Sequence, residues 1–189
     1  MTSAVISQRA LPRSGVVSVL LVVAAAALTA LAAQWRVHLP FTPVPITGQT
    51  FAVLLTGAAL GWKLGATGQL LYVAVGALGA PVFSDASGGF DVIVGATGGY
   101  LLGFVFAAGV VGWMAELRQD RTFATMFTAF ILGSVVIYMF GAIGLMIAAD
   151  MTPTGAVEAG VVPFLLGDLI KASAAGILLP GAWRLLGDR

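Results

Sequence analysis

Residues 163–186 read PFLLGDLIKASAAGILLPGAWRLL, an apolar stretch that carries an acid and a base near its start. Asp168 and Lys171 are three residues apart, so a helix places them on one face. A charge in hydrocarbon costs roughly 2.5–3.5 kcal/mol on insertion scales, so such residues usually pair and mark a function. The pair predicts either a bridge that only pins this helix to its neighbours or the polar floor of a ligand cavity that opens outward.

The composition places the rest of the chain in a lipid bilayer too. Of its 189 residues, 59% are hydrophobic and 9% are charged, whereas soluble domains carry about 25% charged residues. The mean hydropathy is +1.03. We expect one transmembrane domain over residues 1–189, because the polar connections are too short to form a second.

The charged and reactive residues exclude several other classes of protein. A net charge of +1 argues against a nucleic-acid partner. The chain has no cysteine and one histidine, His38, so we expect no thiolate site, no multi-histidine metal site and no cofactor. No serine lies in a nucleophile-like motif, so an intramembrane enzyme is disfavoured.

Six apolar runs predict an all-α membrane protein with six transmembrane helices. The first run also fits a secretory signal peptide, but its 19 residues exceed the usual apolar core of about 7–15, so we expect a retained helix. Lys63 and Gly65 mark a tight turn between the second and third runs. The expected helices are 15–33, 49–62, 64–80, 95–117, 123–149 and 163–186.

Three longer connections separate these helices on one side. Residues 34–47, QWRVHLPFTPVPIT, contain three prolines that forbid a continuing helix. This segment is either an interfacial connector anchored by Trp35 or a loop that folds back over the bundle and caps a cavity. Residues 81–94 and 150–162 are expected to be irregular connections on the same side.

Basic residues predict the orientation of the bundle. Six helices put both ends of the chain on one side, and that side has seven of the eight basic residues outside the helices. By the positive-inside rule, both termini are cytoplasmic. The long loops, which contain Arg36, then face outward. The seven inner residues are Arg9, Arg13, Lys63, Arg118, Arg121, Arg184 and Arg189.

Polar side chains gather at the outer side, above the acid–base pair. Buried polar groups need hydrogen-bond partners, which a polar ligand could supply. Glycine pairs permit a close backbone approach, so the N–H groups of Gly88 and Gly89 are candidate donors. The candidate side chains are those of Gln49, Ser84, Asp85, Ser87, Asp91, Thr97, Tyr100, Asp168 and Lys171.

Small residues recur at four-residue spacing in two of the expected helices, which lets helix backbones approach closely in lipid. Gly95, Gly99 and Gly103 form one such series, and we expect it to serve packing within the bundle. Ala26 and Ala30 form another in the first helix, where a partner subunit is one candidate for the contact.

Four motifs, in order along the chain, resemble those of the BioY family, the biotin-binding S components of energy-coupling factor (ECF) transporters. LPFTPVPITGQT at 39–50 resembles the first-loop signature, and YVAVGALGAPVF at 72–83 is similar to the third helix and its loop. GATGGYLLGF at 95–104, preceded by the glycine pair, resembles the fourth-helix motif. PFLLGDLIK at 163–171 resembles the sixth-helix motif.

The resemblance implies an ECF S-component-like bundle in a prokaryotic plasma membrane that binds biotin from outside. It implies partners as well: a transmembrane coupling subunit, docked at Ala26 and Ala30, and ATPase subunits. The family pattern places ligand contacts at Ser84 to Gly89, Tyr100, Asp168 and Lys171. Ala96 stands where the family often has proline, and Gly48 where leucine is more usual.

The chemistry of biotin agrees with these residues. Asp168 can accept the ureido N–H bonds, and Lys171 can donate to the ureido carbonyl or to Asp168. Phe83, Phe90 and Tyr100 are candidates for an apolar wall. No arginine lies between Arg36 and Arg118, so the partner of the ligand carboxylate stays open among hydroxyls, backbone N–H groups, Arg36 and water.

Two other functions remain as alternatives. One is an S component for another vitamin, thiamine or riboflavin, against which the DLIK sequence at 168–171 argues. The other is a self-contained biotin transporter, which would have to work as a homo-oligomer because 189 residues without an internal repeat lack the usual architecture.

Overall fold

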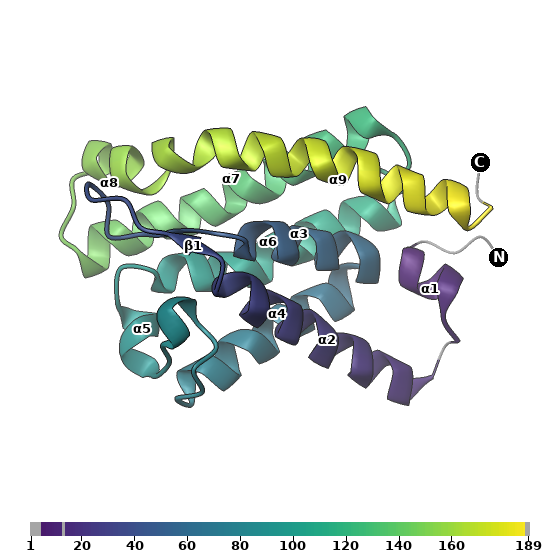
Figure 1. Cartoon of the computed structure of the whole chain (residues 1–189), viewed down its shortest axis with the longest axis horizontal. Coiled ribbons are helices and arrows are strands. Elements are labelled where there is room, and N and C mark those ends of the chain that lie inside the picture. The colour runs from purple at the N-terminus through teal and green to yellow at the C-terminus, as the bar shows by residue number, and fades with distance from the viewer. Residues whose placement is uncertain (1–4, 13, 188–189) are drawn as a thin grey trace.

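The computed structural model describes residues 5–12 and 14–187, and the described chain is mostly helical. Figure 1 shows the long helices running side by side as one bundle. The helices are α1 (Ile6–Ala10), α2 (Gly15–Ala33), α3 (Gln49–Leu60), α4 (Trp62–Ala77), α5 (Phe90–Val94), α6 (Gly98–Glu116), α7 (Phe123–Ala148), α8 (Pro153–Gly160) and α9 (Leu165–Leu185). Two 3-10 turns cover Ser84–Ala86 and Val162–Phe164, and strands β1 (Arg36–Val37) and β2 (Ile46–Thr47) pair antiparallel.

Four segments are long and apolar enough to cross a membrane: α2, α6, α7 and the stretch Pro153–Leu185 that ends with α9. The prediction of an all-α membrane protein agrees with them. The helix α3 has 12 residues and α4 has 16, both fewer than the about 20 that a span needs. These two lie second and third among the six predicted spans.

Several helix boundaries differ from the sequence-based expectation. The predicted turn at Lys63 and Gly65 is wrong, because both residues lie inside α4. The corner between α3 and α4 is Gly61, whose φ of 85° is a left-handed value that glycine adopts at low cost. The two irregular connections contain short helices, α5 and α8, and Thr152 caps α8 by accepting a hydrogen bond from the Gly155 N–H.

The helix α6 lies at the centre and packs against α3, α4 and α7. Its contacts are close because small residues face one another. A Cβ added at Gly57 of α3 would lie 2.6 Å from the carbonyl oxygen of Ala108, and one added at Gly103 would lie 3.0 Å from the Cβ of Phe140. The packing role expected for Gly99 and Gly103 is confirmed, whereas Gly95 precedes α6.

Docking of a partner at Ala26 and Ala30 on the first helix stays a prediction, and both residues also pack within this chain. Ala26 is 9% exposed and belongs to the core, and Ala30 packs against that core. Both therefore contact helices of this chain. The outward face of α2 consists of larger apolar side chains: Val16, Val19, Leu20, Val23, Leu28 and Leu31.

The two ends of the bundle differ in charge. At one end α1 lies beside the end of α9, where Arg9 donates to the Leu186 carbonyl oxygen, and at the other lie the hairpin, α5 and α8 (Figure 1). The helix α1 contacts α3, and Glu116 at the end of α6 accepts a hydrogen bond from the Trp62 N–H beside the α3–α4 corner. Of the seven basic residues predicted to share one side, Arg13 and Arg189 lie outside the described residues; the other five, Arg9, Lys63, Arg118, Arg121 and Arg184, lie in or beside these segments.

Candidate functional site

A cavity of about 320 Å³ lies toward the end of the bundle that has the hairpin. Its size falls at the lower end of the usual range for small-molecule pockets, about 300–1,000 Å³. The loop of residues 34–47 folds back over the bundle and supplies part of the lining, so the second of its two interpretations is confirmed. The lining residues are His38, Pro43, Val44, Pro45, Thr47, Gln49, Thr50, Phe83, Ser84, Asp85, Ser87, Val92, Thr97, Tyr100, Leu101, Phe104, Ile137, Tyr138, Phe164, Asp168 and Lys171.

The acid–base pair of α9 lies in this lining, and we call its polar cluster the floor. Lys171 Nζ lies 2.8 Å from Asp168 Oδ1, 2.7 Å from Thr50 Oγ1 and 3.1 Å from the Thr47 carbonyl oxygen. An ammonium group has three N–H donors, so these partners account for all of them. Lys171 therefore orients the floor, and the expectation that it donates to Asp168 is confirmed.

Asp168 is 4% exposed and has two further partners. Thr50 Oγ1 donates to its Oδ1 over 3.2 Å, and the Tyr138 hydroxyl donates to its Oδ2 over 2.6 Å. A carboxylate offers about four lone-pair sites, and these three bonds leave one on Oδ2. The floor can thus accept one more N–H or O–H donor.

Thr50 and Tyr138 are site residues that the sequence reasoning missed. Thr50 is the last residue of the quoted first-loop motif, and Tyr138 is one of four hydroxyl side chains in the mostly apolar α7, with Thr125, Thr128 and Ser134. A polar group at membrane depth needs a partner, and this rule was the signal in the sequence by which Tyr138 could have been found. Its partner, Asp168, is 30 residues further along the chain.

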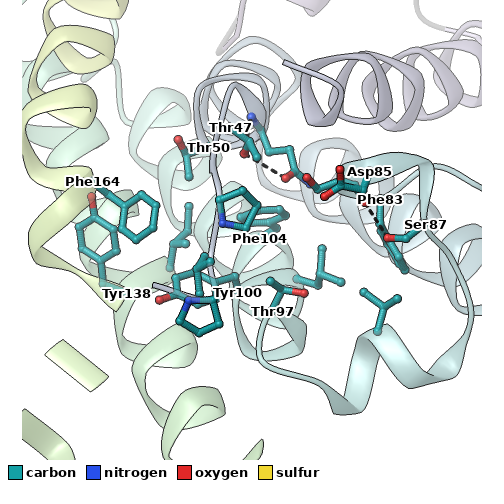
Figure 2. A pocket seen from close by; sticks show the side chains of 18 of the residues that line it. Thr47, Thr50, Phe83, Asp85, Ser87, Thr97, Tyr100, Phe104, Tyr138 and Phe164 are labelled. Carbon is teal, nitrogen blue, oxygen red and sulfur yellow. Dashed lines mark hydrogen bonds between the residues drawn. The ribbon is translucent and has the colours of Figure 1, made fainter. Parts of the chain in front are cut away.

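Aromatic and aliphatic side chains form the wall between the two polar parts of the cavity. Figure 2 shows Tyr138 and Phe164 on one side, Asp85 and Ser87 on the other, and Tyr100 and Phe104 between them. The Tyr100 hydroxyl donates to the Gly160 carbonyl oxygen over 2.7 Å, so its ring is the part that faces a ligand.

Phe83 lines the cavity as expected and is 2% exposed. The same expectation for Phe90 is wrong, because this side chain is 66% exposed and is not among the lining residues.

The loop 83–87 brings three predicted residues to the cavity: Ser84, Asp85 and Ser87. The Oγ of Ser84 is buried and has no hydrogen-bond partner among the described residues. The Oγ of Ser87 donates to the Ser84 carbonyl oxygen over 2.6 Å.

The structure does not bring Gly88 and Gly89 to the cavity. The Gly89 N–H donates to the Gly76 carbonyl oxygen over 2.7 Å, and a Cβ at Gly88 would collide with the backbone of Ala80. This pair packs the loop onto the end of α4, and the Gly89 N–H already has a partner. A ligand contact of Gly88 and Gly89 stays a prediction.

An ionic cluster joins the two loops above the cavity. Arg36 Nε lies 2.5 Å from Asp85 Oδ1, and His38 Nε2 lies 3.0 Å from Asp85 Oδ2. The hairpin segment thus contributes two basic side chains and the loop 83–87 one acidic side chain. No group of three or more metal-ligating side chains occurs within the described residues.

Gln49, the remaining predicted residue, lies at the first turn of α3. Its Nε2 donates to the Tyr72 hydroxyl over 2.7 Å, and its Oε1 accepts from Thr47 Oγ1 over 3.0 Å. Tyr72 in turn donates to the Val82 carbonyl oxygen. Gln49 therefore lines the cavity and also connects the hairpin to the loop that follows α4.

Membrane-length helices around a cavity with an ionisable floor define a membrane protein that binds a small polar ligand. The family model described as the BioY family matches residues 4–188, and the chain belongs to the BioY family.

Curated relatives and a solved structure agree with this assignment. The "Biotin transporter BioY" of Thermotoga maritima is 37% identical over 90% of this chain and 93% of that protein. The "Probable biotin transporter BioY" of Pyrococcus horikoshii is 38% identical over 86% and 91%. The crystal structure of "the S-component for biotin from an ECF-type ABC transporter" matches with a TM-score of 0.81 over 94% of this chain and 96% of that chain, at 22% identity. This last match shows that the fold is shared.

Proposed function

We propose that this protein is the biotin-binding S component of an ECF-type vitamin transporter and has no enzymatic activity. Asp168 carries the proposal: a buried carboxylate in a cavity, oriented by three hydrogen bonds and able to accept one more donor. Biotin uptake is also the role in the names of the relatives. A coupling subunit and ATPase subunits would complete the transporter.

The floor suits the ureido ring of biotin. A ureido N–H is a donor that Asp168 Oδ2 can accept, and a hydrogen bond to a charged group is worth roughly 1.5–3 kcal/mol. The apolar ring sulfur and the aliphatic chain fit between Phe104, Phe164 and Leu101, which line the wall. The ligand then runs from the floor toward the loop 83–87.

The carboxylate of biotin belongs at the loop end of the cavity. The floor has one acid and one base, so its formal charge is zero. At the other end Arg36 and Asp85 also cancel, and His38 contacts the same carboxylate. An anionic group is better placed there because Arg36 retains N–H donors beyond the Nε that contacts Asp85.

We further propose that the chain crosses the membrane six times with both termini in the cytoplasm. Five of the described basic residues, Arg9, Lys63, Arg118, Arg121 and Arg184, gather at the α1 end, which the positive-inside rule assigns to the cytoplasm. The cavity, at the opposite end, then opens to the outside. In this arrangement α3 and α4 are the two short crossings of a plasma-membrane protein.

Isothermal titration of the detergent-purified protein tests the ligand, with biotin, thiamine and riboflavin as separate titrants and no nucleotide present. We expect one-to-one binding of biotin with a Kd well below the micromolar range, which corresponds to more than about 8 kcal/mol. Micromolar or weaker binding of biotin, or equal binding of thiamine, contradicts the proposal.

A further inference from the structure

Gln34 lies just after α2 and contacts the loop 83–87 from outside the cavity. We propose that Gln34 is a positioning residue: its side-chain amide fixes this loop so that the hydroxyl of Ser84 forms a hydrogen bond with bound biotin. The inference rests on the proposed function, since it concerns the same cavity. It adds a residue that does not itself line that cavity.

The residue Ser84 lines the cavity, and its hydroxyl has no hydrogen-bond partner among the described residues. It is buried, and none of the described residues donates to it or accepts from it. Leaving a buried hydroxyl unpaired is unfavourable, and native proteins keep few such groups. Its neighbours Phe83 and Asp85 line the same side of the cavity (Figure 2). Rotation about the Cα–Cβ bond of Ser84 turns this hydroxyl toward a ligand that reaches this side, and the ligand then supplies the missing partner.

The amide of Gln34 holds the backbone on both sides of Ser84. Its Nε2 donates to the Phe83 carbonyl oxygen and to the Ala30 carbonyl oxygen, each over 3.1 Å. Its Oε1 accepts from the Ala86 N–H over 3.3 Å. Rotating the amide by 180° would oppose like groups at all three contacts, so the three partners fix its orientation.

The loop needs such support because its backbone is strained. Asp85 has a φ of 64° and Ala86 a φ of 49°. Aspartate tolerates the left-handed region, whereas alanine is rarely found there. Such residues cost on the order of 1–3 kcal/mol and persist only where surrounding contacts fix them. The contact from Gln34 to the Ala86 N–H acts on the more strained of the two.

The other contacts of the loop fix its ends. The Phe83 ring packs edge-on against Tyr72, with ring centroids 5.4 Å apart, and the Gly89 N–H donates to Gly76. Asp85 is held through its side chain by Arg36 and His38. Gln34 contacts the backbone directly on both sides of Ser84, and this fixes the position from which the Ser84 side chain reaches the cavity.

A double-mutant cycle tests the inference, with biotin affinity measured by titration of the full chain. We expect Ser84→Ala to weaken binding about fivefold to tenfold, as for one lost hydrogen bond. Gln34→Met keeps the length of the side chain but none of the bonds, and we expect a similar loss. In the double variant the loss should equal that of Ser84→Ala alone, because Gln34 acts through that hydroxyl.

Two results would overturn the inference: an unchanged affinity in Ser84→Ala, or losses that multiply in the double variant. If Gln34→Met does not fold, Gln34→Glu replaces it, since it keeps the acceptor for the Ala86 N–H and removes the donors. Gln69→Met is the matched control, because Gln69 is fully buried and bonds Thr29 and Thr56 away from the cavity. It should lower the melting temperature and leave biotin affinity and the effect of Ser84→Ala unchanged. Failure of the proposed function would look different, because the unmodified protein would not bind biotin.

Discussion

Replacing Asp168 by asparagine removes the charge of the floor and almost nothing of its volume. The new side chain keeps one acceptor oxygen, which can still face Lys171 and Thr50. Its Nδ2 then faces the Tyr138 hydroxyl and the position of the ligand N–H. A donor replaces an acceptor where the proposed pose needs an acceptor.

The structure sets the size of two separate effects. Losing a hydrogen bond between the ligand and a charged group costs roughly 1.5–3 kcal/mol, so the Kd should rise roughly tenfold to hundredfold. Removing one partner of a buried ion pair costs about 3–5 kcal/mol of stability. Because the Lys171 side chain remains 21% exposed, we expect the lower end of that range.

Titration calorimetry and thermal unfolding on the same preparation separate the two effects. Asp120→Asn is the matched control, because Asp120 is fully buried, pairs with Arg121 over 3.1 Å and accepts from Trp183 at the opposite end of the bundle. It should leave biotin affinity unchanged. If Asp168→Asn bound biotin as tightly as the unmodified protein while melting at a lower temperature, the pair would be a structural bridge and the binding role would be refuted.

Three further predictions concern topology, packing and pH. A cysteine at Ser87 should react with an impermeant thiol reagent added outside intact cells and one at Gln119 should not; the opposite pattern would reverse the orientation. Ala26→Trp should lower the melting temperature of the isolated protein, because Ala26 is 9% exposed, whereas Leu20→Trp on the 61% exposed face of α2 should not; equal melting temperatures would contradict the assigned core. Burial raises the pKa of Asp120 above its usual range, so its stabilising contribution is complete below the usual aspartate pKa and is lost as the pH rises through the folded-state value. The melting temperature should therefore fall as the pH rises, and Asp120→Asn should remove the part of this fall that Asp120 causes. An unchanged dependence of melting temperature on pH would show that Asp120 does not contribute.

The sequence was sufficient to predict the helical membrane class and the acid–base pair of the floor. Both depend on local information: hydropathy over a window of residues, and the three-residue spacing of Asp168 and Lys171 on one helix. The family assignment followed from four motifs in order, and their residues now lie around one cavity. Where the pattern is local, the structure agrees with it.

The partners of that pair could not be predicted because they come from distant elements. Thr50 lies 118 residues before Asp168 in the chain and Tyr138 lies 30 residues before it. A polar residue in an apolar helix indicates that a partner exists, but not which one. Gly88, Gly89 and Ala26 show the same limit: spacing identifies small residues, and only packing decides what they contact.

The short length of α3 has a consequence for how the cavity arises. Twelve residues rise only about 18 Å at roughly 1.5 Å per residue, well short of a hydrocarbon layer of about 30 Å. In the proposed six-span arrangement the remaining thickness falls to the non-helical segment before Gln49, and such backbone is tolerated at that depth where it lines a cavity. Because Gln49 and Thr50, at the first turn of α3, lie in the lining, one added helical turn at this end would occupy the space of a ligand. The start of α3 is thus one boundary of the binding volume, and the length of a single helix limits the size of the ligand that this chain can accept.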